Sequence, residues 1–153
     1  MVKERKARQQ VVAAIDALDN QEPHQQLTAR LLDNAAAQAM AEGVPLKILC
    51  VVPAPALVYA GIVNARMSGD FLLDTMAIAE KKTQALVEHL GISPEAIDVA
   101  TGRVEEVVSQ RALQANALLV IGNAANKGLK DLLIGNTAER MLRGMKTDML
   151  VVN

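Results

Sequence analysis

Residues 118–143 read LLVIGNAANKGLKDLLIGNTAERMLR and hold the most informative pattern in the chain. The apolar run Leu118–Ile121 predicts a buried strand, and Gly122 begins a polar loop rich in glycine, asparagine and lysine. Asn136 and Glu139 have the spacing of a capping box, so a helix is expected to begin there. A strand, a loop and a helix in this order are typical of a parallel α/β sheet.

The same organisation repeats on both sides of this stretch. Short apolar runs predict four more strands, at 11–15, 46–52, 97–100 and 149–152. Apolar residues spaced three and four apart predict helices through 27–40, 72–90, 104–115 and 136–145. Gly43 is expected to end the first helix and Asp70 to cap the second, with residues 53–69 irregular. Because no hairpin signal interrupts the alternation, the predicted fold class is α/β: a five-stranded parallel sheet with helices on both faces, Rossmann-like.

The composition narrows the classes of protein that fit. The chain has 153 residues, which suits one domain, and it is 51% hydrophobic but only 1% aromatic. A net charge of −1 and only two aromatic residues, Tyr59 and Phe71, argue against a nucleic-acid binder. The single cysteine, Cys50, has no internal disulfide partner, so a cytoplasmic location is expected. No apolar run is long enough to predict a membrane span.

Catalytic residue types are scarce in the pattern. His24 and His89 are predicted to be ordinary surface histidines, far from each other and from the functional edge of the sheet. Cys50 falls inside an apolar strand, where a thiol is usually an inert small hydrophobe. The chain has no His-Glu-x-x-His, no cysteine pair, no Gly-x-Ser-x-Gly elbow and no P-loop. We therefore expect neither a catalytic residue nor a metal site.

The carboxyl ends of the strands form the expected functional edge. Ligands of open parallel sheets bind at this edge, near the point where the strand order reverses. The residues there are Asp16, Val51 to Pro53, Gly102, and the loop from Gly122 onward. Backbone N–H groups at the start of the last helix could receive phosphate oxygens, with lysines of the loop nearby. The glycines could equally serve only to make turns, and the residues alone leave both interpretations open.

The loop and helix start carry a motif. Gly122, Ala125, Gly135 and Asn136 occupy the four fixed positions of the pattern G-x2-G-x9-G-[ST], with the final nine-residue gap intact. Together with Asp16 after the first strand, this segment strongly resembles the universal stress protein family. The resemblance spans nearly all of residues 10–153 and is closest to the E-type members, which contain two such domains in tandem.

The resemblance implies a fold like that of the adenine nucleotide alpha hydrolases, and a nucleotide site. Asp16 would contact the adenine and ribose side of ATP or another adenine nucleotide, and Val51 would pack against the base. The phosphates would be surrounded by Gly122, Asn126, Gly135, Asn136 and Thr137, mostly through backbone N–H groups. Ala125 replaces the second glycine of the motif and Asn136 replaces Ser/Thr, so the pocket is expected to be weakened or vestigial and the nucleotide not obligatory.

Three functions follow as alternatives. The first is a stress-response binding or signalling module with a weakened adenine-nucleotide pocket, and not a fast enzyme. The second is an ATP-binding member with slow hydrolysis or autophosphorylation, assisted by Asp16. The third is a non-nucleotide domain for dimerisation or protein interaction.

Partners and domain limits are also predicted. The resemblance implies a homodimer, or pairing with a second universal stress protein domain, and Met149–Val152 is a terminal strand suited to it. Neither nucleic acid nor a membrane is expected as a partner. Residues 1–9 are expected to be a charged lead-in or a linker, and residues 10–153 the domain.

Overall fold

The computed structural model describes residues 7–53, 65–122 and 147–153. Five strands form one sheet in the order β3-β2-β1-β4-β5, and each neighbouring pair is parallel. The strands are β1 (Gln10–Ile15), β2 (Leu46–Pro53), β3 (Ile97–Gly102), β4 (Ala117–Gly122) and β5 (Met149–Val152). The predicted α/β class and five-stranded parallel sheet are therefore confirmed.

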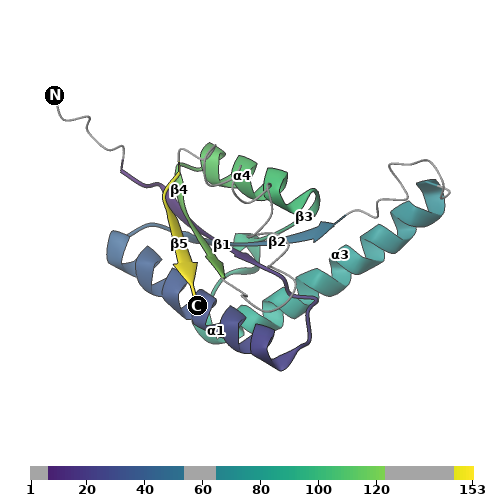
Figure 1. The fold of residues 1–153 in the computed structure, drawn as a ribbon, viewed down its shortest axis with the longest axis horizontal. Coiled ribbons are helices and arrows are strands. Elements are labelled where there is room, and N and C mark those ends of the chain that lie inside the picture. Colours follow the sequence, from purple (N-terminus) through teal and green to yellow (C-terminus); the bar gives the residue numbers. More distant parts are fainter. Residues whose placement is uncertain (1–6, 54–64, 123–146) are drawn as a thin grey trace.

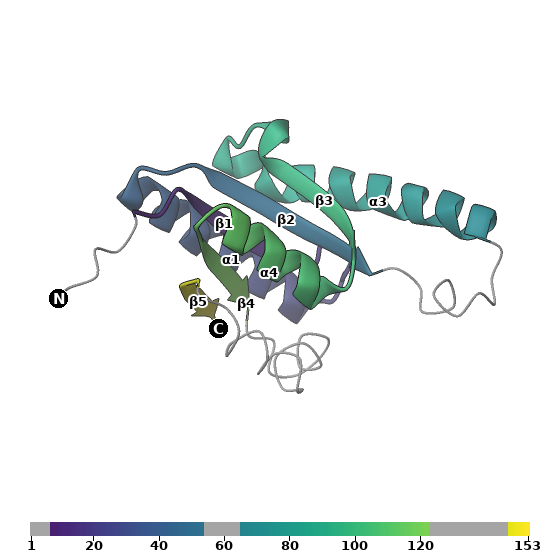
Figure 2. The same ribbon diagram turned by 90° about the horizontal axis from the view of Figure 1, so that it is seen from above.

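Helices cover both faces of the sheet. The helices are α1 (Glu22–Glu42), α3 (Ala65–Val87) and α4 (Val104–Gln114), with two short 3-10 turns at Glu88–Leu90 and Pro94–Ala96. Helices α1 and α3 pack on one face, and α4 packs on the other (Figures 1 and 2). Burial on both faces explains why the strands are apolar runs without alternation.

The two halves of the core follow the alternation of side chains along the strands. Val11, Ala13 and Ile15 point to the side of α1 and α3, whereas Val12 points to the side of α4. Gly43 ends α1 in a left-handed conformation with φ of 65°, as its position predicts. The aliphatic core expected from the composition is thus split into two layers by the sheet.

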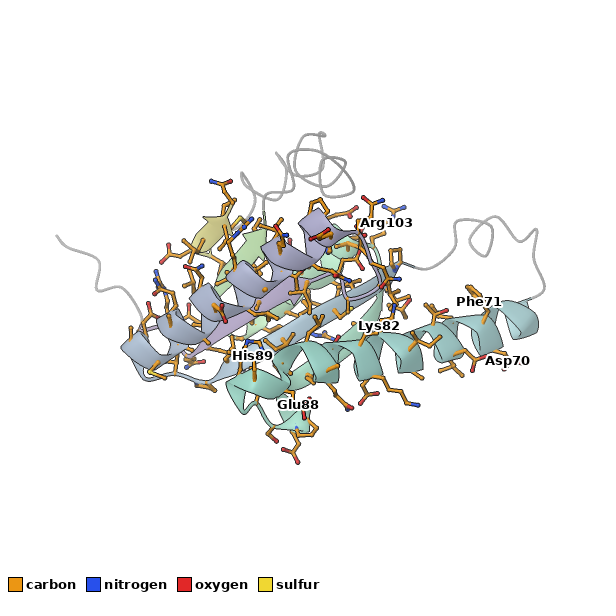
Figure 3. The ribbon with its side chains drawn as sticks, turned by 90° about the horizontal axis from the view of Figure 1, so that it is seen from below. Asp70, Phe71, Lys82, Glu88, His89 and Arg103 are labelled. Carbon is orange, nitrogen blue, oxygen red and sulfur yellow. The ribbon has the colours of Figure 1, made fainter. Side chains whose placement is uncertain are left out.

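Helix α3 departs from its predicted start. It begins at Ala65, so residues 65–69 are helical and the expectation that 53–69 is irregular is wrong there. Asp70 lies inside the helix and is not its N-cap, which corrects the prediction made for that residue. Gly69 disfavours a helix interior by about 1 kcal/mol, but no proline stands between Ala65 and Asp70, and the helix extends through that stretch. Figure 3 shows Asp70 and Phe71 on the part of α3 that projects beyond the sheet.

Candidate functional site

The edge at the carboxyl ends of the strands is set by the topology. Strand β1 is followed by α1 and by β2 on one side, while β4 lies on its other side. The order therefore reverses between β1 and β4, which is where ligands of such sheets bind. Asp16 follows β1 directly and Gly122 is the last residue of β4. The structure thus places these two predicted site residues at the same edge of the sheet, at the ends of neighbouring strands.

Gly122 is buried beneath helix α1. A Cβ added at this glycine would lie 3.0 Å from Leu27 Cδ2 and 3.5 Å from Leu31 Cδ1. The structure therefore gives Gly122 a packing role, because any side chain at this position would require Leu27 to shift by a few tenths of an ångström. From the sequence, the backbone at Gly122 was expected to lie close to the phosphates of a ligand. In the structure it lies close to helix α1.

Ile15, the last residue of β1, pairs with Cys50 of β2, and Val51 is the next residue along β2. It is half-buried and packs with the cluster on the α4 face, whereas Cys50 belongs to the α1 and α3 face. Val51 and Asp16 therefore both reach the carboxyl edge. Val51 is available to an adenine base only from the α4 side of the sheet.

The loop from β1 to α1 is held by two aspartates. Asp16 Oδ1 accepts the backbone N–H of Leu18 at 3.0 Å, and Asp19 Oδ1 accepts that of Gln21 at 2.9 Å. Each is an Asx turn, in which a side chain satisfies a backbone donor two residues later. The carboxylates are fixed in direction by their own loop, and Asp16 remains exposed.

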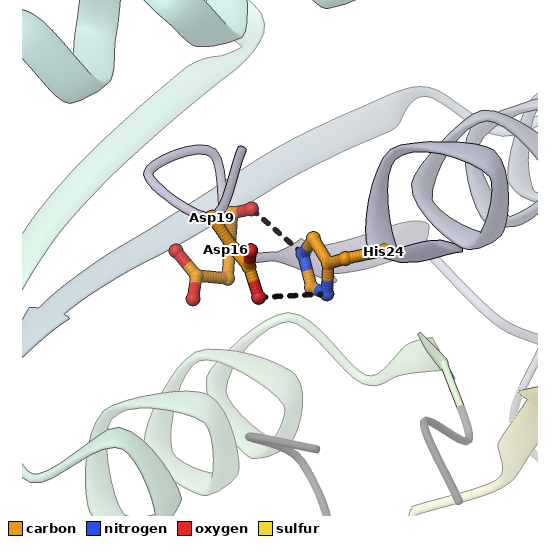
Figure 4. A group of neighbouring side chains, drawn as sticks. All are labelled: Asp16, Asp19 and His24. Carbon is orange, nitrogen blue, oxygen red and sulfur yellow. Dashed lines mark hydrogen bonds and ion pairs between the residues drawn. The ribbon is translucent and has the colours of Figure 1, made fainter. Parts of the chain in front are cut away.

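His24 is the functional-edge residue that the sequence prediction missed. Its Nε2 lies 3.0 Å from the backbone oxygen of Asp16, and its Nδ1 lies 3.6 Å from Asp19 Oδ2 (Figure 4). The side chain is 10% exposed, so the expectation of a surface histidine far from this edge is wrong. A signal was present in the topology: the helix that follows a parallel strand starts at the carboxyl edge, and His24 is in its first turn. His89, by contrast, is exposed and pairs with Asp33 at 3.4 Å, as a surface histidine should.

A cavity of about 270 Å³ opens beside this loop. It lies between α1 and α3, and neither Val51 nor Gly122 lines it. Across it, Lys82 Nζ of α3 donates a hydrogen bond to Asn20 Oδ1 at 3.0 Å. The residues that line it are Asp16, Ala17, Asp19, Asn20, His24, Gln25, Thr28, Lys82, Ala85 and Leu86.

Cys50 lies below the same edge but is closed off from it. The thiol side chain is 1% exposed, and burial raises its pKa above the ordinary value. The nearby charge of Asp16 adds to the rise, while a backbone hydrogen bond from Ala17 and a side-chain hydrogen bond with Thr83 oppose it. The predicted burial of the thiol is confirmed, and a raised pKa is what a thiol in apolar surroundings should have.

The phosphate-side part of the predicted site lies outside the described residues. Nothing in the structure tests the roles predicted for Asn126 or for the helix start at Gly135, nor the effect of Ala125. The predicted residues in this position are Ala125, Asn126, Lys127, Lys130, Gly135, Asn136 and Thr137.

These observations define a class of protein: a Rossmann-like α/β domain with polar groups at the switch point of its sheet. Comparison with family profiles gives a match to the universal stress protein family over residues 7–153, so the chain belongs to that family. Comparison with curated proteins gives no match. None of the helices in the described part of the chain has the length and apolar character needed to span a bilayer.

Solved structures share the fold. A universal stress protein from Pseudomonas aeruginosa is 23% identical, with a TM-score of 0.68, and the match covers 95% of this chain and 48% of that one. A universal stress protein in complex with cAMP is 24% identical, with a TM-score of 0.52 and coverage of 97% and 98%. A universal stress protein from Archaeoglobus fulgidus in complex with dAMP is 16% identical, with a TM-score of 0.55 and coverage of 97% and 100%. This chain spans about half the length of the first Pseudomonas structures it matches.

Proposed function

We propose that this universal stress protein domain binds an adenine nucleotide weakly at the carboxyl edge of its sheet, as a binding or signalling module and not as a fast enzyme. The observation that carries the proposal is the convergence of Asp16 and Gly122 at the point where the strand order reverses. The Asp16 carboxylate at this point of the sheet suits a hydrogen bond with a ribose hydroxyl.

The state of Asp16 supports its role as the ribose contact. One carboxylate oxygen accepts the Leu18 N–H, which fixes the side chain. The other oxygen has no hydrogen-bond partner among the described residues, so it can accept a hydrogen bond from a sugar hydroxyl. Two members of the family have been solved with adenine nucleotides, cAMP and dAMP, which makes this ligand class the one to test.

Weak binding is expected for two reasons. The chain has only two aromatic residues, so the adenine would rest on aliphatic groups such as Val51 and lose the stabilisation of stacking. In addition, Ala125 stands where the family motif has glycine. If the backbone there must adopt positive φ, alanine costs about 1 kcal/mol or more.

Isothermal titration calorimetry with cAMP, AMP and ATP–Mg²⁺ tests the proposal. We expect binding with Kd well above about 1 µM, and a loss of about tenfold or more in Asp16→Asn, because the amide keeps the Asx turn but loses the charge. Asp33→Asn changes an exposed aspartate in the middle of α1; it is the matched control and should bind as the wild type does. Absence of binding of all three nucleotides at millimolar concentration would overturn the proposal.

Pairing through β5 is the second candidate function. In the described part of the chain β5 pairs with β4 alone, so it forms an edge of the sheet. Val151 on this strand is 44% exposed, and exposed edge strands are templates for pairing with another chain or domain. We propose that this edge joins a second universal stress protein domain, in a homodimer or in a tandem arrangement of the E type.

A further inference from the structure

We propose that the loop between β1 and α1 holds a divalent transition-metal ion, such as Zn²⁺ or Mn²⁺, between Asp16, Asp19 and His24. Each of these residues offers one ligand atom, and the three atoms all lie within 4.8 Å of one another. Figure 4 shows the imidazole of His24 directed at the backbone oxygen of Asp16 and at the carboxylate of Asp19. This inference does not rest on nucleotide binding, but it shares Asp16 with the proposed ribose contact, so its tests use the nucleotide-free chain.

The hydrogen bond of His24 fixes which nitrogen faces the aspartate. The backbone oxygen of Asp16, 3.0 Å from Nε2, can only accept, so Nε2 carries a hydrogen and donates it. In the neutral ring the lone pair of Nδ1 then faces Asp19 Oδ2 at 3.6 Å. Two acceptors face each other there unless a proton or a cation lies between them.

This arrangement matches how proteins prepare a histidine for a metal. A ligating imidazole nearly always donates its other N–H to a carbonyl or carboxylate, which fixes the tautomer and the ring orientation. His24 already makes this bond, and its side chain is 10% exposed. The Asx turns of Asp16 and Asp19 likewise use one oxygen of each carboxylate and fix the direction of the other.

Thr28 is a second, independent observation that points to a ligand. It lies one turn after His24 on α1, is 4% exposed and lines the same cavity. Its hydroxyl has no hydrogen-bond partner among the described residues, although Thr75 and Thr83 each donate to the carbonyl four residues earlier. None of the fully enclosed polar side-chain atoms in the described residues lacks a partner. The Thr28 hydroxyl therefore opens to the cavity, where it can bind a metal-coordinated water.

The charges around the loop favour a cation of this class. Asp16 and Asp19 place two carboxylates close together, and Lys82, which lines the same cavity, donates its ammonium hydrogen bond to Asn20 at 3.0 Å. An imidazole with two carboxylate oxygens suits Zn²⁺ or Mn²⁺, whereas Mg²⁺ and Ca²⁺ prefer oxygen ligands alone. The about 270 Å³ cavity leaves room for the waters that complete the coordination.

Calorimetric titration of the nucleotide-free chain with Zn²⁺ tests the site. We expect one equivalent to bind, and His24→Gln and Asp19→Asn each to weaken it by about tenfold or more. Glutamine can still donate to the Asp16 oxygen, so the loop geometry is retained. The matched controls are His89→Gln and Asp33→Asn, an exposed histidine–aspartate pair of the same chain, which should leave the affinity unchanged. Unchanged affinity in His24→Gln would overturn the proposal.

A spectroscopic readout on the wild type avoids any dependence on variant folding. Zn²⁺ should shift the ¹⁵N resonance of His24 Nδ1 and leave both nitrogens of His89 unchanged. Equal shifts of both histidines, or none at a hundred micromolar or so of Zn²⁺, would show that no such site exists. Because no nucleotide is present, either failure leaves the nucleotide proposal standing.

Discussion

Gly122 at the end of β4 lies against Leu27 of α1 so closely that a Cβ on the glycine would be 3.0 Å from the leucine Cδ2. Because Leu27 is itself 5% exposed, it cannot move aside without disturbing its neighbours. We therefore expect Gly122→Ala to lower the free energy of unfolding by about 1–3 kcal/mol, measured by urea denaturation.

A double-mutant cycle identifies the cause. Leu27→Ala removes the atoms that the new methyl group would meet, so the pair of substitutions should cost clearly less than the sum of the two single ones. Strict additivity would mean that the glycine matters for a different reason.

The ion pair between Arg111 of α4 and Asp98 of β3 should contribute modestly. Arg111 Nε donates to Asp98 Oδ2 at 2.7 Å, with side chains 37% and 23% exposed. We expect a coupling free energy of about 0.5–1 kcal/mol in a cycle of Arg111→Ala and Asp98→Ala, falling in 1 M salt or thereabouts. Arg103 and Glu106, 3.5 Å apart and both about two-thirds exposed, form the control pair, which should show almost no coupling.

The buried thiol of Cys50 is expected to make the stability of the fold decrease at alkaline pH. Burial raises the pKa of its thiol in the folded state above the ordinary value of about 8.5. The unfolded chain therefore loses this proton first, and the stability linked to it is complete below the ordinary pKa and falls as the pH rises beyond it. Relative to Cys50→Ala, the wild type should lose stability as the pH rises from about 8 through the alkaline range, as measured by urea denaturation at each pH. A constant difference across this range would contradict the prediction.

A charged residue placed on the exposed edge strand β5 is expected to reduce dimer formation. Val151→Lys places a charge on the exposed edge strand, which opposes strand pairing, so the fraction of dimer in light scattering should fall. Leu113→Lys, on α4 and 50% exposed, is the control for a general change in hydrophobicity and should not alter the mass. A wild-type chain that is monomeric at high concentration would count against the edge as an interface.

The sheet was predictable because its strands are buried on both faces. Apolar runs ended by Asp16, Pro53 or Gly122 locate β1, β2 and β4 within a residue or two of their observed ends. The start of α3 could not be predicted from the sequence. Asp70 can cap a helix, but an acidic residue can equally lie inside one. Local preference does not choose between these positions when the preceding residues tolerate a helix.

The candidate site was predictable only in part. The topology rule placed Asp16 and Gly122 at one edge, and the structure agrees. The contact that packs Gly122 against Leu27 joins residues 95 positions apart, and no local pattern encodes it. The grouping of His24 with Asp19 follows from the way the loop turns back, and a motif search keyed to known ligand spacings does not detect it.

The parallel sheet places the two ends of the described chain at opposite edges, which determines where a fluorescent label would lie relative to the proposed nucleotide site. Val152 pairs with Gly122, so Asn153 stands at the carboxyl edge, and its backbone oxygen accepts a hydrogen bond from Arg30 Nε at 3.1 Å. Ala7 lies at the opposite edge, where the Asn116 side-chain amide donates to its backbone oxygen, and a six-residue strand separates the two by roughly 20 Å. A fluorophore attached at Asn153 would therefore lie at the same edge of the sheet as the proposed nucleotide site, and the same fluorophore near Ala7 would lie at the opposite edge and serve as its reference.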